Sequence, residues 1–105
     1  MNTHAPKDKI IVHVDSDLED LIPDFLTKRQ KEIDIIQQAL RQSDFNTIYV
    51  LGHGMKGSGG AYGFDRLTEI GAVLEKSAKE QNIFSIIDCI EKLSDYFSRI
   101  EVKYC

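Results

Sequence analysis

The sequence predicts an all-α domain, and three amphipathic segments support this prediction. Apolar side chains recur at intervals of three and four residues along residues 16–40, 65–80 and 83–102, which is the spacing of one face of an α-helix. The chain has 105 residues, enough for one modest hydrophobic core. With 42% hydrophobic and 29% charged residues, its composition is typical of a folded globular domain and too apolar for a disordered chain.

Charge and hydropathy exclude several classes of protein. The formal net charge of −4 argues against a nucleic-acid-binding protein, which normally carries a basic face. The sequence has no apolar run near the ~20 residues of a membrane-spanning helix, and its first nine residues lack the apolar core of a secretory signal. We therefore expect a cytoplasmic protein. Cys89 and Cys105 have no C-x-x-C spacing and predict neither a zinc site nor a redox motif.

Residues 1–15 are expected to form an N-terminal arm, ahead of a helical domain at residues 16–105. The arm begins with a polar leader, and the β-branched run at residues 10–14 has the propensity of a short extended strand. The sequence suggests no partner strand for this run. His4 and His13 are isolated histidines, which we interpret as surface or packing residues.

The first helix is expected to begin at Ser16, because Ser16-Asp17-Leu18-Glu19 fits a capping box. Pro23 interrupts its pattern, and a proline inside a helix removes one backbone hydrogen bond and clashes with the preceding turn. We therefore expect a kink, or a short helix followed by a longer one. The face expected to be a solvated mixed-charge surface carries Lys28, Arg29, Lys31, Glu32 and Asp34.

Two later helices have plausible start signals. Asp65 is the predicted N-cap of one, and Asn82 is available as the N-cap of the other. The last helix is expected to run to about Val102, with Cys89 as a small residue of its buried face.

The stretch between these segments, residues 52–63, holds six of the seven glycines and His53. In one interpretation, residues 47–51 form a strand and residues 52–57 match G-x-G-x-x-G, the fingerprint of a dinucleotide-binding loop. The context disagrees, because long helical patterns flank the motif, no βαβ repeat follows it, and the chain leaves little room for a parallel sheet.

In the other interpretation, this stretch belongs to a helix that begins near Phe45. The side chains gathered on its buried side are then Phe45, Ile48, Gly52, Met55, Gly59 and Tyr62. His53 falls roughly 130° from the centre of this side and faces water. The residues on the same outer flank as His53 are Tyr49, Lys56, Gly57 and Gly60.

Glycines beside His53 predict access by another protein. Each helical glycine costs about 1 kcal/mol relative to alanine, so their number indicates that the lack of side chains is useful. A neutral imidazole is a nucleophile near pH 7, and Lys56 would attract a phosphoryl group attached to the His53 ring. The pattern favours a phosphohistidine carrier over a stand-alone enzyme, and Gly63 is predicted to end the helix as a C-terminal cap.

The motif resembles that of a known family. His53-x-x-Lys56-Gly57 with Gly63 beyond, followed by a helix through Leu74-Glu75, is similar to the pattern of histidine-containing phosphotransfer (HPt) domains of two-component phosphorelays. The resemblance covers nearly the whole chain after residue 14. It implies an antiparallel four-helix bundle at residues 16–105, with His53 phosphorylated, Lys56 supporting the phosphoryl group and Gly57, Gly60 and Tyr49 providing partner access. Gly54 and Met55 depart from the family pattern.

The resemblance also implies partners. We expect a response-regulator receiver domain, a hybrid sensor kinase or both, with no nucleic acid, membrane, metal or cofactor, because Mg²⁺ belongs to the receiver domain. Two alternatives stay open. A small nucleotide-binding protein using residues 52–57 requires a strand at residues 47–51, and a non-catalytic helical interaction module has no need of His53.

Overall fold

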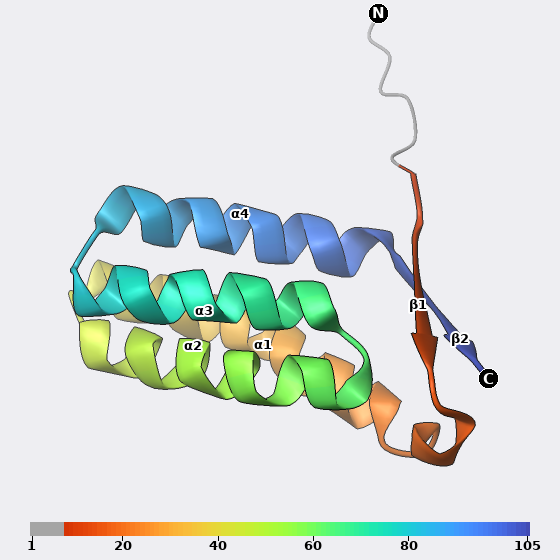
Figure 1. Cartoon of the computed structure of the whole chain (residues 1–105). Helices are drawn as coiled ribbons and strands as arrows, with labels where there is room; N and C mark the ends of the chain where they lie inside the picture. Colours follow the sequence, from red (N-terminus) through yellow and green to blue (C-terminus); the bar gives the residue numbers. More distant parts are fainter. Residues whose placement is uncertain (1–7) are drawn as a thin grey trace, which may run out of the picture.

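Four helices packed side by side make up most of the molecule (Figure 1). The computed structural model describes residues 8–105, so most of the predicted leader, with His4, lies outside the described residues. The helices are α1 (Ile22–Arg41), α2 (Phe45–Gly59), α3 (Asp65–Lys79) and α4 (Ile83–Arg99). The short elements are the strands β1 (Ile10–Val14) and β2 (Ile100–Tyr104) and the 3₁₀ turns η1 (Ser16–Leu18) and η2 (Gly60–Tyr62). The predicted, mostly helical fold with four helices is confirmed.

The chain enters α1 differently from the sequence prediction. Asp15, not Ser16, caps the first turn, because its side chain accepts a hydrogen bond from the amide of Asp17 at 2.9 Å, and that turn is the short η1. The long helix begins only at Ile22, which places Pro23 in its first turn. Proline is tolerated there because its missing N–H would have no partner inside the helix anyway. The expected kink at Pro23 is therefore not confirmed, and the alternative, a short helix followed by a longer one, corresponds to η1 followed by α1.

Caps define the ends of the other helices. The side chain of Asp44 accepts a hydrogen bond from the amide of Thr47 and begins α2, and Asn82 caps α4 as predicted. The prediction that Asp65 caps α3 is wrong, because Asp65 is the first helical residue and the cap position belongs to Phe64. An acidic residue in a first turn still suits the helix dipole.

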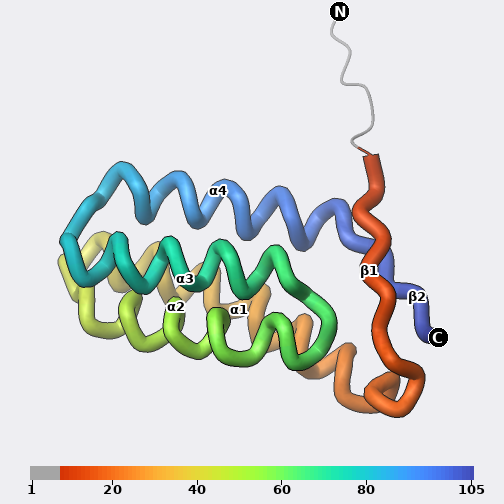
Figure 2. The backbone as a smooth tube through the Cα atoms, viewed as in Figure 1, coloured from red at the N-terminus to blue at the C-terminus, as the bar shows by residue number. Residues whose placement is uncertain are grey.

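The N-terminal strand does have a partner, in a segment that the sequence predicted as helix. β1 pairs in parallel with β2, with Ile10 opposite Ile100 and Val14 opposite Tyr104. α4 accordingly ends at Arg99 and not near residue 102. The two strands lie together at one end of the helices (Figure 2). The expected arm is thus one half of a small sheet, anchored to the core by Val12 and Val14.

The core lies between the helices and is capped by this sheet. Its largest fully buried side chains are Tyr96, Phe64, Ile22, Ile36, Ile48, Met55, Leu67, Leu74, Ile86 and Leu93. Burial raises the pKa of the Tyr96 hydroxyl to about 12. Cys89 is buried, as predicted. Among residues 8–105, the helices lack the length and apolar character needed to cross a membrane.

A charged pair is buried inside the predicted solvated face of α1. Arg29 and Glu32 are only 8% and 7% exposed, and two nitrogens of Arg29 each lie 3.0 Å from an oxygen of Glu32. Arg29 also donates to the hydroxyl of Ser58 on α2 at 3.1 Å and lies over the ring of Phe25. Burial raises the pKa of the Glu32 carboxyl, and the Arg29 guanidinium opposes that shift. The prediction of a wholly solvated face is wrong at these two residues.

Candidate functional site

The glycine-rich stretch is helical, which decides between the two interpretations of the sequence. Residues 47–51 and 52–57 all lie in α2, so the strand required by a dinucleotide-binding loop does not exist. Of the predicted buried side, Ile48, Gly52, Met55 and Gly59 are buried, and Phe45 and Tyr62 are partly buried against the core. His53 lies on the opposite side of the helix, and 67% of its side chain is exposed.

Two of the glycines bring α2 and α3 together, a role that the sequence interpretation did not assign to them. A Cβ atom on Gly52 would lie 2.7 Å from the main-chain nitrogen of Glu75, and one on Gly59 would lie 2.7 Å from that of Thr68. Gly71 completes the contact from α3, because its Cβ would lie 2.6 Å from the main-chain nitrogen of Lys56. These separations exclude any side chain, so the glycines permit close approach of the two backbones.

The other glycines of the stretch lie at the surface. Cβ atoms on Gly54 and Gly57 would meet no atom within 4 Å, so the helix surface one turn after His53 is open, as predicted. Gly60 is exposed but lies at the end of α2, where its amide donates to Thr68 Oγ1 at 2.6 Å. Gly63 has a φ of 93°, which favours glycine, and ends η2 as the predicted C-terminal cap.

Glu75 of α3 connects the two predicted site residues. Its Oε2 lies 2.5 Å from His53 Nδ1, and its Oε1 accepts a hydrogen bond from Lys56 Nζ at 2.9 Å. Its side chain is 15% exposed, against 44% for Lys56. No role for Glu75 was predicted from the sequence.

A weak signal for Glu75 is present in the sequence. Gly52 and Gly71 contact each other across the helix pair, and the residues four positions later, Lys56 and Glu75, lie on the same faces one turn along. This spacing predicts a contact between Lys56 and Glu75 only when the contact between Gly52 and Gly71 is known, because a glycine inside a helix can equally mark a cap or an open surface.

The ionisation of Glu75 sets the hydrogen position on His53. The hydrogen bonds from Lys56 and then His53 hold the pKa of Glu75 below its usual value, and Glu75 raises the pKa of Lys56. Near neutral pH the carboxylate can only accept, so we assign the hydrogen of a neutral His53 ring to Nδ1. Nε2 then keeps its lone pair, and it has no hydrogen-bond partner among residues 8–105.

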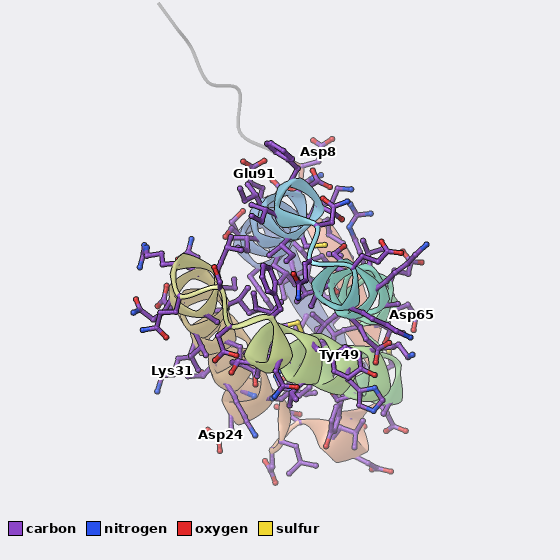
Figure 3. The ribbon with its side chains drawn as sticks, turned by 90° about the vertical axis from the view of Figure 1, so that its left-hand side faces the viewer. Asp8, Asp24, Lys31, Tyr49, Asp65 and Glu91 are labelled. Carbon is purple, nitrogen blue, oxygen red and sulfur yellow. The ribbon has the colours of Figure 1, made fainter. Side chains whose placement is uncertain are left out.

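Tyr49 and Ser58 flank His53 along α2 in different ways. The ring of Tyr49 is nearly parallel to that of His53, with centroids 6.4 Å apart, and Tyr49 lies at the surface of α2 (Figure 3). Ser58 donates to the carbonyl of Gly54 at 2.8 Å and accepts from Arg29 of α1, so its hydroxyl is engaged away from His53. This agrees with the helical periodicity, which places Ser58 roughly 140° around α2 from His53.

Comparison with family models assigns the chain to a family. A model described as the Hpt domain matches residues 20–102. The chain belongs to the Hpt domain family. The match spans all four helices of this Hpt domain and the whole stretch around His53, but not β1. Neither the curated proteins nor the solved structures gave a match.

Family membership supplies the general role of this Hpt domain. Hpt domains carry phosphoryl groups on histidine in two-component phosphorelays, where they work with receiver domains and kinases. The described part of the chain contains no cluster of three or more histidine, cysteine or acidic side chains arranged to hold a metal ion.

Proposed function

We propose that His53 is the residue that carries the phosphoryl group. In this proposal, the chain accepts phosphate from a receiver-domain aspartate or a kinase and passes it to a response regulator. The observation that carries the proposal is the exposed imidazole of His53, which is held at Nδ1 by Glu75 with Lys56 bound to the same carboxylate. His13 is also exposed but lacks such an arrangement, since within residues 8–105 its side chain has a hydrogen bond with Cys105 and none with a carboxylate.

The proposed transfer needs no proton movement by this chain. The lone pair of His53 Nε2 attacks the phosphorus of the partner's aspartyl phosphate. The N–P bond forms as the acyl phosphate P–O bond breaks, and its electron pair leaves on the partner's carboxylate. The imidazole becomes cationic and keeps its hydrogen on Nδ1, where the Glu75 carboxylate stabilises the new charge. Transfer to a response regulator reverses these steps.

Lys56 and Glu75 have complementary tasks in this proposal. The Lys56 ammonium is flexible and 44% exposed, so it can reach the phosphoryl oxygens once they are bound to His53. Glu75 fixes the ring orientation that directs Nε2 to solvent. We propose that the Mg²⁺ of the reaction belongs to the receiver domain and that Gly57, Gly60 and Tyr49 form part of the surface that meets it.

The arrangement of the helices supports a rigid site. We propose that the four helices form an antiparallel bundle, a topology favoured by the short connections between consecutive helices. α2 forms its most extensive contact with α3, the helix that supplies Glu75. His53, Lys56 and Glu75 therefore lie on two elements whose relative position is set by the contact between Gly52 and Gly71.

A transfer assay tests the proposal. The chain is mixed with a receiver domain phosphorylated by acetyl phosphate and Mg²⁺, and acid-labile, alkali-stable phosphate on the chain is measured. We expect label on the wild type and on His13→Gln, and none on His53→Gln. Full labelling of His53→Gln would refute the assignment. A wild type that binds receiver domains but accepts phosphate from none of them would favour the helical interaction module.

A further inference from the structure

The small sheet has two edges, and its hydrogen bonds show which residues face outward. The amide of Cys105 donates to the carbonyl of Val14, and its carbonyl accepts from the amide of Ser16, both at 3.0 Å. Main-chain groups of successive residues alternate in direction along a strand. Lys103 and Glu101 therefore also face β1, whereas Ile100, Val102 and Tyr104 direct their main-chain groups to the outer edge of β2.

The outer edge of β1 is partly covered, at His13. By the same alternation the carbonyl of His13 points away from β2, and it lies 3.1 Å from the position that a Cβ on Gly63 would take. The turn between α2 and α3 thus packs against this edge. On β2, the outward amide of Ile100 bonds to the carbonyl of Tyr96. Within residues 8–105, the outward main-chain groups of Val102 and Tyr104 have no hydrogen-bond partner.

The sequence of β2 is complementary to itself in one antiparallel register. A two-fold axis at Val102 places Glu101 opposite Lys103 and Ile100 opposite Tyr104 of a second copy. In this register Val102 forms a hydrogen-bonded pair with Val102 of the second copy, because the main-chain groups of both residues point to the outer edge. Glu101 and Lys103 fall at the non-hydrogen-bonded positions, where side chains are closest.

The neighbouring registers are disfavoured. The neighbouring registers that also use the outward main-chain groups of β2 have their two-fold axis at Glu101 or at Lys103. An axis at Glu101 places two carboxylates directly opposite each other, and an axis at Lys103 does the same with two ammonium groups. The charges therefore select the register centred on Val102. On the other face of β2, Val102 is half-buried and Tyr104 is 37% exposed, so pairing would extend the apolar row of this strand with its copy.

We propose that the outer edge of β2 pairs antiparallel with β2 of a second copy of this chain, forming a four-stranded sheet across a two-fold axis. The amide of each Val102 donates to the carbonyl of the partner's Val102, and the amide of each Tyr104 donates to the carbonyl of the partner's Ile100. The contact is small, so the dimer is weak and depends on concentration. It is separate from the transfer site, because no hydrogen bond, ion pair or ring contact of His53 within residues 8–105 involves β2.

Sedimentation velocity over rising concentration tests the association. The buffer contains a reductant because Cys105 is exposed and could form a disulfide. We expect a reversible monomer–dimer equilibrium. A chain that stays monomeric up to millimolar concentration overturns the proposal.

Charge exchange tests the register. Glu101→Lys and Lys103→Glu each place like charges opposite each other, so each variant alone should dimerise roughly tenfold more weakly than the wild type. An equal mixture of the two should form a heterodimer of near wild-type affinity, because every cross-strand pair is again of opposite charge. Loss of the ion pairs of Glu101 with Lys9 and Lys103 within one chain cannot explain recovery on mixing. A mixture no more associated than its components overturns the register.

Val102→Pro tests the backbone contact. Proline removes the outward amide, and the neighbouring residues that face β1 keep theirs. We expect a monomer whose helical circular dichroism and phosphate labelling match the wild type. Val102→Thr is the matched control that keeps the amide and should still dimerise. Undiminished dimerisation of a folded Val102→Pro chain overturns the proposal.

Discussion

Two glycines of α2 should respond to alanine in opposite ways, although both lie in one helix. Alanine at Gly57 meets open space, so it should stabilise the chain by about 1 kcal/mol through helix propensity. Alanine at Gly52 gains the same propensity but places its Cβ 2.7 Å from the main-chain nitrogen of Glu75. Relief requires α2 and α3 to separate, and overpacking of this kind costs about 1–3 kcal/mol. The two variants should therefore differ by about 2 kcal/mol.

Urea unfolding followed by circular dichroism measures this difference. With an m-value of about 2 kcal/mol/M, the midpoint of Gly52→Ala should lie about 1 M below that of Gly57→Ala. Gly54→Ala, which also meets open space, is the control and should behave like Gly57→Ala. Equal midpoints for all three variants would falsify the inference that Gly52 is required by contact with α3.

The same variants separate folding from function. Gly57→Ala is more stable by this argument but adds a methyl group to the surface one turn from His53, so it should accept phosphate more slowly from a receiver domain. Gly52→Ala should also lose transfer rate, because separation of the helices moves Glu75 away from His53. Transfer as fast in Gly57→Ala as in the wild type would remove Gly57 from the proposed partner surface.

Three further predictions concern charge. Glu75→Gln should slow phosphate acceptance roughly tenfold, measured by single-turnover labelling. Because the pKa of Glu75 is lowered, its bond to Lys56 stabilises the fold above the ordinary carboxyl pKa, and this stabilisation is lost as pH falls through the lowered pKa. Glu75→Gln should therefore lack the part of the acid destabilisation that comes from protonating Glu75. Tyr96 has a raised pKa of about 12, so the stabilisation by its neutral hydroxyl is complete below the ordinary pKa of 10.0 and is lost as pH rises through 12. Between pH 8 and 11, the free energy of unfolding measured in urea should therefore fall by roughly 1 kcal/mol more for the wild type than for Tyr96→Phe. Arg29→Met should cost about 3 kcal/mol by leaving Glu32 buried without its cation, and adding Glu32→Met should recover most of that loss; equal stability of single and double variants would contradict the pairing.

Local pattern accounts for the parts of the fold that the sequence predicted. The apolar spacing of the four helices, the cap at Asn82 and the positive φ at Gly63 depend on residues within a few positions of one another. The solvent-facing side of His53 follows from the same helical periodicity. The family motif around His53 is equally local, which is why the sequence alone indicated a phosphotransfer domain.

Failures occurred where a partner distant in the sequence decides the outcome. Residues 100–102 continue a helical pattern, yet Ile100 begins a strand because β1, some ninety residues earlier, pairs with the segment that starts there. Pro23 looked like an interruption because the pattern before it seemed helical, and the structure begins the helix next to it instead. Arg29 and Glu32 looked solvated because the periodicity of α1 cannot show that Arg29 bonds to Ser58 of another helix.

The sequence by itself determined that this protein is helical and that His53 faces solvent beside Lys56, since both properties follow from the repeat of a single helix. Only the tertiary structure decided what holds the histidine. Glu75 reaches His53 because Gly52 and Gly71 let two backbones approach more closely than any side chain would allow. The separation between two helices is set by the packing of both surfaces, and the pattern along either one does not contain it.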